Sequence, residues 1–149
     1  MLDPDVSMVK LIDIPTVVDE RGALTVLELD SGVPFPVLRV FFVHDVTPGV
    51  DRGGHAHLET DQVVMASSGS LSVVVRDGRD SRSWLLSGLK QALYIPRGLW
   101  IDLKDFSRGA VCTVLASNVY DPSTSLRTWK AYTQALADTD IKAREHRNV

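Results

Sequence analysis

The amino-acid sequence predicts an all-β protein, an antiparallel sandwich or jelly roll that ends in a short helix. Short segments rich in Val, Ile, Leu, Phe and Thr recur along the chain, and turn residues separate them. Many short strands at regular spacing are typical of antiparallel β architectures and not of βαβ units. After residue 125 the composition changes to Ala, Leu, Lys, Arg and Gln, which favours a single C-terminal helix.

The expected strands follow one another between recognisable turns. The third contains the apolar run at residues 40–43, and Ser68-Gly69 separates the fourth from the fifth. Asp77-Gly78 indicates a tight turn between the fifth and sixth strands. The ninth contains the apolar run at residues 110–115. We expect strands at residues 9–13, 24–29, 36–43, 62–67, 71–77, 82–87, 91–95, 100–103 and 109–117. The expected helix covers residues 126–146, with a break near residues 138–140.

The bulk properties exclude several classes of protein. A chain of 149 residues with 44% hydrophobic and 23% charged residues predicts one soluble domain over residues 1–149, with a core at about 8–121 and a helical segment at about 122–149. A net charge of −3 without a Lys/Arg block argues against a nucleic-acid partner. The apolar runs are too short to span a membrane, and the acidic start lacks the features of a signal peptide. With a single cysteine, Cys112, no intrachain disulfide forms, and we expect a cytoplasmic protein.

The most informative motif is His55-Ala56-His57 with Gln62 behind it. Two histidines two residues apart on a strand point to the same face. The spacing resembles a cupin metal site, in which the pair, a nearby carboxylate and a distant third histidine hold a divalent ion. Here Gln62 takes the place of the carboxylate, and Trp100-Ile101 stand where the third histidine is expected. Two imidazoles and a neutral amide bind such an ion poorly, so we expect no metal.

Beyond this motif, the chain resembles the sugar-nucleotide 3,4-ketoisomerases of the cupin superfamily, the WxcM-like group, from about residue 8 to about residue 133. Each matching motif is weak alone, and their order and spacing together are specific. The motifs are Asp19 to Leu24 with Glu28, Pro34 to Val40, Arg52 to His57 with Gln62, Ser68 to Ser70, Leu93 to Arg97 with Trp100, and Leu115 to Asp121.

The resemblance implies a cupin or jelly-roll antiparallel β-barrel that forms a homodimer, often with an exchanged N-terminal strand. It also implies metal-independent isomerisation of a dTDP-4-keto-6-deoxyhexose, without a cofactor, in deoxysugar biosynthesis. The nucleotide sugar would lie in the mouth of the barrel, and a proton would move between C3 and C4 through an enediolate.

Imidazole suits both proton transfers, because its pKa near neutrality makes both protonation states accessible. We therefore expect His55 and His57 to be catalytic, and which of them is the base stays open. Phe41 departs from the family, which usually has a tyrosine at this position. The residues expected to bind substrate are Arg39, Phe41, Arg52, Gln62, Tyr94, Trp100 and Tyr120.

Three alternatives stay open beside this interpretation. One is a sugar-nucleotide 3,5-epimerase, although such epimerases usually lack the second histidine of the pair, here His57. Another is a non-catalytic sugar-nucleotide binding protein, which the loss of a phenol at Phe41 keeps open. A third is a metal-dependent cupin with an unusual ligand set. A structural ion pair between Arg39 and Glu28 is an alternative to ligand binding by Arg39.

Overall fold

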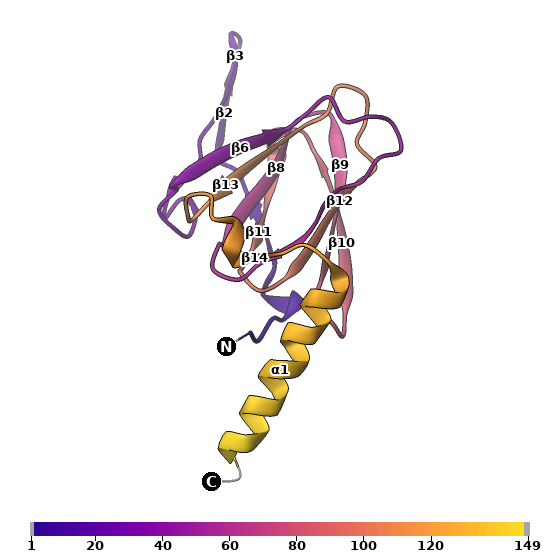
Figure 1. Cartoon of the computed structure of the whole chain (residues 1–149). Helices are drawn as coiled ribbons and strands as arrows, with labels where there is room; N and C mark the ends of the chain where they lie inside the picture. Colours follow the sequence, from indigo (N-terminus) through magenta and orange to yellow (C-terminus); the bar gives the residue numbers. More distant parts are fainter. Residues whose placement is uncertain (1, 148–149) are drawn as a thin grey trace.

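The computed structural model describes residues 2–147 and shows two five-stranded antiparallel sheets packed face to face (Figure 1). In spatial order, the first sheet contains β1 (Lys10–Asp13), β11 (Gln91–Ile95), β8 (Gln62–Ser68), β13 (Val111–Ala116) and β6 (Arg39–Val43). The second contains β10 (Ser81–Ser87), β9 (Ser70–Arg76), β12 (Trp100–Lys104), β7 (Arg52–His57) and β14 (Ser125–Leu126).

The remaining elements lie outside these two sheets. A hairpin of β2 (Thr16–Asp19) and β3 (Gly22–Thr25) projects from one end of the molecule, and the helix α1 (Trp129–Arg147) extends from the other (Figure 1). The short strands β4 (Glu28–Leu29) and β5 (Gly32–Val33) pair in parallel. Single turns of 3₁₀ helix occur at Val6–Met8, Gly88–Lys90 and Pro122–Thr124. No helix within residues 2–147 is both long and apolar enough to cross a bilayer.

The core forms between the two sheets because alternate residues of each strand point inward. On β9, Leu71, Val73 and Val75 are fully buried, while the residues between them are partly exposed. They pack in one cluster with Val64 and Val114 of the opposite sheet. This alternation is the pattern that the sequence predicts for an antiparallel sandwich.

The strand β8 is buried on both faces over residues 62–66. Its inward residues join the main core, and its outward residues Val63 and Met65 pack under the segment that contains Val33 and Phe35. The centre of the first sheet is therefore covered on its outer side by the chain between the N-terminal hairpin and β6.

An aromatic cluster attaches the C-terminal helix to the second sheet. Tyr132 is fully buried against Trp100, with ring centroids 5.8 Å apart, and Trp129 contacts both. The Tyr132 hydroxyl donates a hydrogen bond to the carbonyl oxygen of Gly98 at 2.9 Å and lies 3.3 Å from that of Arg76. The first turns of α1 are thereby fixed to the strand β12 and the turn that precedes it.

The predicted fold class is confirmed, since the chain is mostly strand with one C-terminal helix, although the two sheets do not close into one continuous barrel. The expected strand at 24–29 is two short strands. Composition alone indicates neither β2 nor β7, and β7 contains no β-branched residue. The expected break near residues 138–140 is wrong. The helix continues because the Gln134 side chain donates to Asp138, and the Thr139 hydroxyl bonds to the Ala135 carbonyl.

We predict that Tyr132→Phe lowers the free energy of unfolding by about 1 to 3 kcal/mol, because it leaves a buried carbonyl oxygen without its donor. Chemical denaturation followed by circular dichroism measures this change. Tyr94→Phe is the control, since it removes a hydroxyl from an outward-facing tyrosine that no hydrogen bond in the described chain uses. An equal effect of the two substitutions would show that the Tyr132 hydroxyl does not anchor the helix.

Candidate active site

Two adjoining cavities lie between the sheets and share the residues Phe41, His55 and Arg127. One has a volume of about 300 Å³ and reaches toward the core, with Arg52, Gln62 and Ile101 among its lining residues. The other has a volume of about 410 Å³, and its remaining lining residues are Arg39, His57, Tyr120 and Ser125. Residues far apart in the sequence thus meet at one place.

The strand β7 presents both histidines to these cavities. His55 pairs with Ile101 of β12, whereas Ala56 pairs with Trp100, so the imidazoles and Ile101 point between the sheets. A register shift in β12 follows directly after Ile101. The neighbouring Gly53 has a φ of +77°, and a Cβ there would lie 2.8 Å from the Ile101 carbonyl oxygen. Glycine is therefore required where β7 bends ahead of the histidines.

The opposite wall comes from the first sheet. Arg39 of β6 and Gln62 of β8 are both in register with Ala116 of β13, which lies between them. Residues that face each other across a ladder share one side of the sheet, so both side chains point inward. The small Ala116 leaves room between them. Phe41, two residues after Arg39, lies on this same inner face.

The two imidazole rings lie with centroids 4.5 Å apart and meet edge to face. Burial lowers the pKa of His57 to about 4, and the neighbouring His55 and the charges of Arg39 and Arg127 add to this shift. Burial also lowers the pKa of His55, followed by the charge of Arg127. Nδ1 of His57 shares a hydrogen bond of 3.1 Å with the Ser125 hydroxyl. Both rings are therefore neutral at pH 7, the form that accepts a proton.

Three buried nitrogen atoms around the cavities have no hydrogen-bond partner among residues 2–147: Nε of Arg39, Nε2 of His57 and Nε2 of Gln62. A buried polar atom without a partner costs about 1 to 3 kcal/mol, so several in one place indicate a site that a polar ligand completes. Gln62 and His57 form no hydrogen bond with each other within residues 2–147. The Arg39 guanidinium lies over the rings of Phe41 (5.3 Å) and Tyr120.

The donor set does not suit a divalent metal. In the described part of the chain, no three His, Cys, Asp or Glu side chains lie close enough together to hold an ion. Gln62 supplies a neutral amide instead of a carboxylate, and the aliphatic Ile101 pairs with His55 at the place expected for a third histidine. Metal-independent chemistry stays a prediction from these residues.

The structure brings most of the expected site residues together and leaves two apart. His55, His57, Arg39, Phe41, Arg52, Gln62 and Tyr120 all line one or both cavities. Trp100 lies instead in the aromatic cluster beneath α1, and Tyr94 lines a separate cavity of about 380 Å³ with Lys10 and Val33. The reason is strand alternation, because each of them points to the outer face of its sheet.

Two residues of the site, Ser125 and Arg127, are absent from the expected set. They flank Leu126 on and after β14, a two-residue strand that pairs Ser125 with His57. The composition after residue 125 indicates a helix, and so short a strand has no recognisable pattern. The only signal is an arginine just before the helix, close to the matching motif that ends at Asp121.

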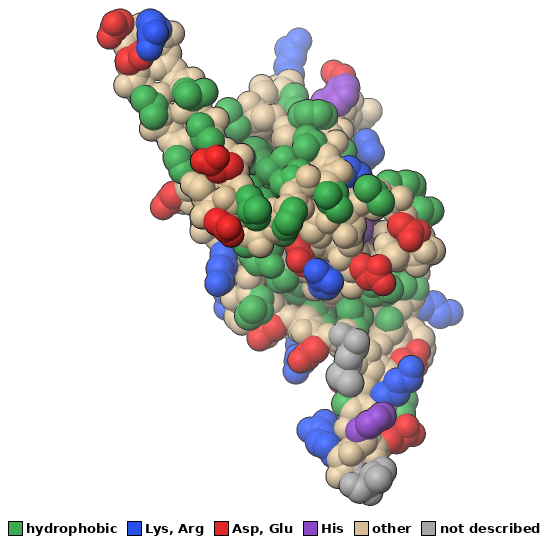
Figure 2. All heavy atoms as spheres, turned by 90° about the vertical axis from the view of Figure 1, so that its left-hand side faces the viewer, with side chains coloured by type: hydrophobic (Ala, Val, Ile, Leu, Met, Phe, Trp, Pro, Cys, Tyr) green, Lys and Arg blue, Asp and Glu red, His purple; other side chains and the backbone are tan. Residues whose placement is uncertain are grey.

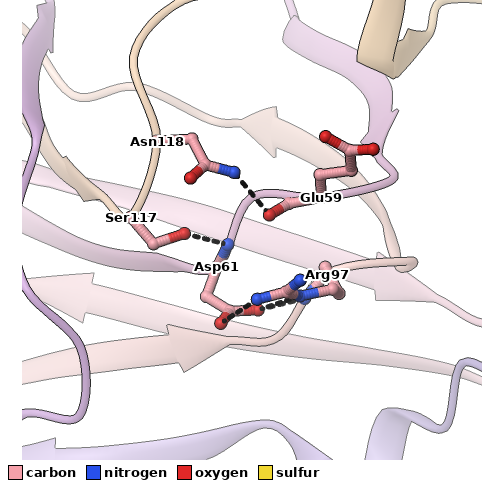
Figure 3. A network of polar contacts seen from close by, with 5 residues as sticks. All are labelled: Glu59, Asp61, Arg97, Ser117 and Asn118. Carbon is pink, nitrogen blue, oxygen red and sulfur yellow. Dashed lines mark hydrogen bonds and ion pairs between the residues drawn. The ribbon is translucent and has the colours of Figure 1, made fainter.

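A polar network fixes the loop between β7 and β8 (Figure 3). The Asp61 carboxylate accepts hydrogen bonds from the backbone N–H and guanidinium of Arg97, and its backbone N–H donates to the Ser117 hydroxyl. The Asn118 amide donates to the Glu59 carbonyl oxygen at 2.7 Å. The loop that separates His57 from Gln62 is therefore tied to the ends of β11 and β13, which fixes both walls of the site.

Comparisons with known proteins agree on one family. Residues 7–137 match the protein family described as FdtA: WxcM-like, C-terminal. A TDP-4-oxo-6-deoxy-alpha-D-glucose-3,4-oxoisomerase from Aneurinibacillus thermoaerophilus is 30% identical over 133 residues, which make up 89% of this chain and 96% of the relative.

Solved structures give the same result. A 3,4-ketoisomerase from Helicobacter canadensis is 32% identical with a TM-score of 0.84, covering 87% of this chain and 98% of that one. A sugar 3,4-ketoisomerase from Thermoanaerobacterium thermosaccharolyticum in complex with TDP is 29% identical, with a TM-score of 0.83 and coverage of 88% and 96%. A dTDP-4-dehydrorhamnose 3,5-epimerase from Bacillus anthracis shares the fold at 16% identity and a TM-score of 0.72, covering 83% and 80%.

The lowered pKa of His57 predicts a specific dependence of stability on pH. Between about pH 6.5 and pH 4 the unfolded chain binds a proton at His57 that the folded chain does not, so stability falls as the pH falls through this window. Denaturation from pH 7 to pH 4 measures the slope, with His57→Gln as the comparison. The variant should show a shallower slope, and unchanged slopes would contradict a neutral, partly buried His57.

Proposed function

The chain belongs to the FdtA family of WxcM-like domains, and from this membership we propose that it converts TDP-4-oxo-6-deoxyglucose into its 3-oxo isomer. It is an isomerase of the sugar-nucleotide 3,4-ketoisomerase class. The observation that carries the proposal is the pair of neutral imidazoles beside the two adjoining cavities. There, buried nitrogen atoms of Arg39 and Gln62 have no partner in the described part of the chain.

The reaction needs a base near C3 and an acid near C4 of the sugar. Removal of the C3 proton leaves an electron pair that forms a C3=C4 double bond, while the C4 carbonyl oxygen becomes negative. The C3 hydroxyl proton then passes to the C4 oxygen, which becomes a hydroxyl, and a proton adds to C4 as the C3 carbonyl forms. We assign His55, which lines both cavities, as the principal base or proton shuttle. His57 orients it or exchanges protons with the sugar hydroxyls.

Arginine side chains provide positive charge for a nucleoside diphosphate sugar. Arg52 lines the inner cavity and Arg39 the outer one. None of the ion pairs formed within residues 2–147 includes either of them, or Glu28, so the structure gives Arg39 no structural ion pair with Glu28. TDP in the Thermoanaerobacterium enzyme supports TDP as the carrier of the sugar here. We propose that both arginines contact the nucleotide sugar.

The test is proton NMR of TDP-4-oxo-6-deoxyglucose incubated with the protein in D₂O. A 3-oxo product with deuterium at C4 is the expected result, and its couplings give the C4 configuration. Exchange at C5 would instead support a 3,5-epimerase. Binding of TDP without any exchange would support a non-catalytic binding protein. Phe41→Tyr, which introduces the phenol, would then be the first variant to test for activity. The cytoplasmic location stays a prediction.

We also propose that the protein is a homodimer and that the β2–β3 hairpin takes part in the interface. The hairpin projects from the sheets, and Val17, Val18 and Leu24 on it are exposed (Figures 1 and 2). The edge strand β6 also exposes Val40 and Phe42. Figure 2 shows hydrophobic side chains along the projecting hairpin and across the face beside it. Apolar surface of this extent on a small protein indicates a partner, and a second copy supplies the same surface.

Replacement of the proposed base should separate catalysis from binding. We expect His55→Asn to reduce turnover on the order of 10²- to 10⁴-fold while the affinity for TDP changes no more than severalfold. Turnover by NMR and TDP binding by calorimetry measure the two effects. His44→Asn is the matched control, because His44 is exposed and paired with Asp45 outside both cavities. Equal losses of turnover and affinity in His55→Asn would contradict the catalytic role.

The dimer proposal predicts that charges on the hairpin weaken association. Val17 and Leu24 face each other across the two strands, so a Val17→Asp/Leu24→Asp double variant places two carboxylates on one face. We expect a dimer for the unmodified chain and a shift toward monomer for the double variant in sedimentation velocity. Leu85→Asp, at an exposed site on β10, should leave the dimer intact. A monomeric unmodified chain would overturn the proposal, as would a double variant that associates normally.

A further inference from the structure

Arg127 occupies the border between the two cavities, next to His55. It follows β14, which pairs Ser125 with His57 and Leu126 with Ala56. Strand alternation therefore turns Leu126 toward the aromatic cluster under α1, where it packs, and turns Ser125 and Arg127 toward the cavities. Continuation of the same register places Arg127 opposite His55. Both cavities include Arg127 and His55 in their lining.

The guanidinium of Arg127 has no acidic partner among the ion pairs of the described chain. Its hydrogen bond runs from Nη2 to the neutral hydroxyl of Tyr120 at 3.2 Å. A guanidinium carries five N–H donors, so most of its donors remain free for a ligand. Its charge is strong enough at the imidazoles to contribute to the lowered pKa values of both His55 and His57. Arg127 is exposed at the cavity mouth, and its free donors can reach an anion bound in the cavities.

Two kinds of negative charge are available in the proposed reaction, the diphosphate and the enediolate. Arg52 lies in the inner cavity alone and Arg39 in the outer cavity alone, whereas Arg127 lies at the border with His55. The negative C4 oxygen lies two bonds from C3, the carbon from which the base removes its proton. A cation beside the base is therefore close to the enediolate, wherever the diphosphate extends.

We propose that Arg127 is a catalytic residue of the isomerisation, which donates hydrogen bonds to the enediolate oxygen that forms when His55 takes the C3 proton. The inference rests on the proposed ketoisomerase function and adds a residue to it. As the C3–H bond breaks, its electron pair moves into the C3=C4 bond, and the negative charge collects on the C4 oxygen beside the guanidinium. Arg127 gives up no proton. The charge on the C4 oxygen disappears when this oxygen takes up the proton of the C3 hydroxyl, and the C3 carbonyl forms as C4 is protonated.

Tyr120 is the positioning residue of this arrangement. Its hydroxyl accepts a hydrogen bond from the Arg127 guanidinium. The guanidinium of Arg39 lies over its ring, with Cζ 5.5 Å from the ring centroid. The family usually has a phenol at the position of Phe41, and here the phenol that faces the same cavity belongs to Tyr120. Tyr120→Phe therefore removes the bond to Arg127 and keeps the aromatic surface for Arg39.

The test compares Arg127→Gln and Arg127→Lys with the unmodified protein. We expect kcat of Arg127→Gln to fall on the order of 10²- to 10³-fold, with TDP affinity unchanged within severalfold, because the donors act on the transition state alone. Arg127→Lys keeps the charge and should recover part of kcat. The pKa of His55, followed by NMR, should rise in Arg127→Gln, since a nearby positive charge is removed.

A second variant keeps the test decisive if Arg127→Gln folds poorly. Tyr120→Phe should lower kcat less than Arg127→Gln does, and the double variant should be no slower than Arg127→Gln alone, because the two residues act as one unit. A loss of TDP affinity equal to the loss of kcat would overturn the proposal and assign Arg127 to the diphosphate. Full kcat in Arg127→Gln would also overturn it. If the unmodified protein does not turn over the sugar, the ketoisomerase function itself fails.

Discussion

The pairing of β7 with β12 on one side and β14 on the other is the constraint on which the site depends. Because side chains alternate along each strand, this register decides which residues enter the cavities and which face the helix. His55, Ile101 and Ser125 turn inward, while Trp100 and Leu126 turn outward to the cluster around α1. A shift of one residue in β12 or β14 would exchange the two sets.

The electrostatics of the site follow from its position between two apolar sheets. Burial keeps both imidazoles neutral. Arg39 and Arg127 beside them contact aromatic rings or a phenol instead of carboxylates. Positive charge without a carboxylate favours an anionic ligand and disfavours a metal cation. Unpartnered buried donors cost stability, and the extensive core between the sheets offsets this cost.

Much of the architecture was accessible from sequence because it depends on local patterns. Alternation predicts β9 and β10, Asp77-Gly78 predicts their turn, and the spacing of His55 and His57 predicts a shared face. Arg39 and Gln62 were expected to bind substrate, and both line the cavities. The positions of Trp100 and Tyr94 were not, because a motif does not say which face of the sheet a residue occupies.

Arg127 shows the complementary limit of sequence reasoning. Its role depends on a two-residue strand that exists only because Ser125 pairs with His57, 68 residues away in the chain. The same limit applies to the β2–β3 hairpin. Within one chain its apolar residues Val17, Val18 and Leu24 are exposed, and the proposed second copy would cover them. Contacts that are distant in sequence, or that lie between chains, leave no periodic pattern in a short segment.

Turnover after removal of metal tests the central claim most directly, namely that imidazoles and guanidinium groups catalyse proton transfer without a metal ion. The protein would be treated with a chelator, its metal content measured by mass spectrometry, and its turnover of TDP-4-oxo-6-deoxyglucose followed by NMR. The account predicts unchanged turnover when the metal content is far below one ion per chain. Loss of turnover that a divalent cation restores would contradict it.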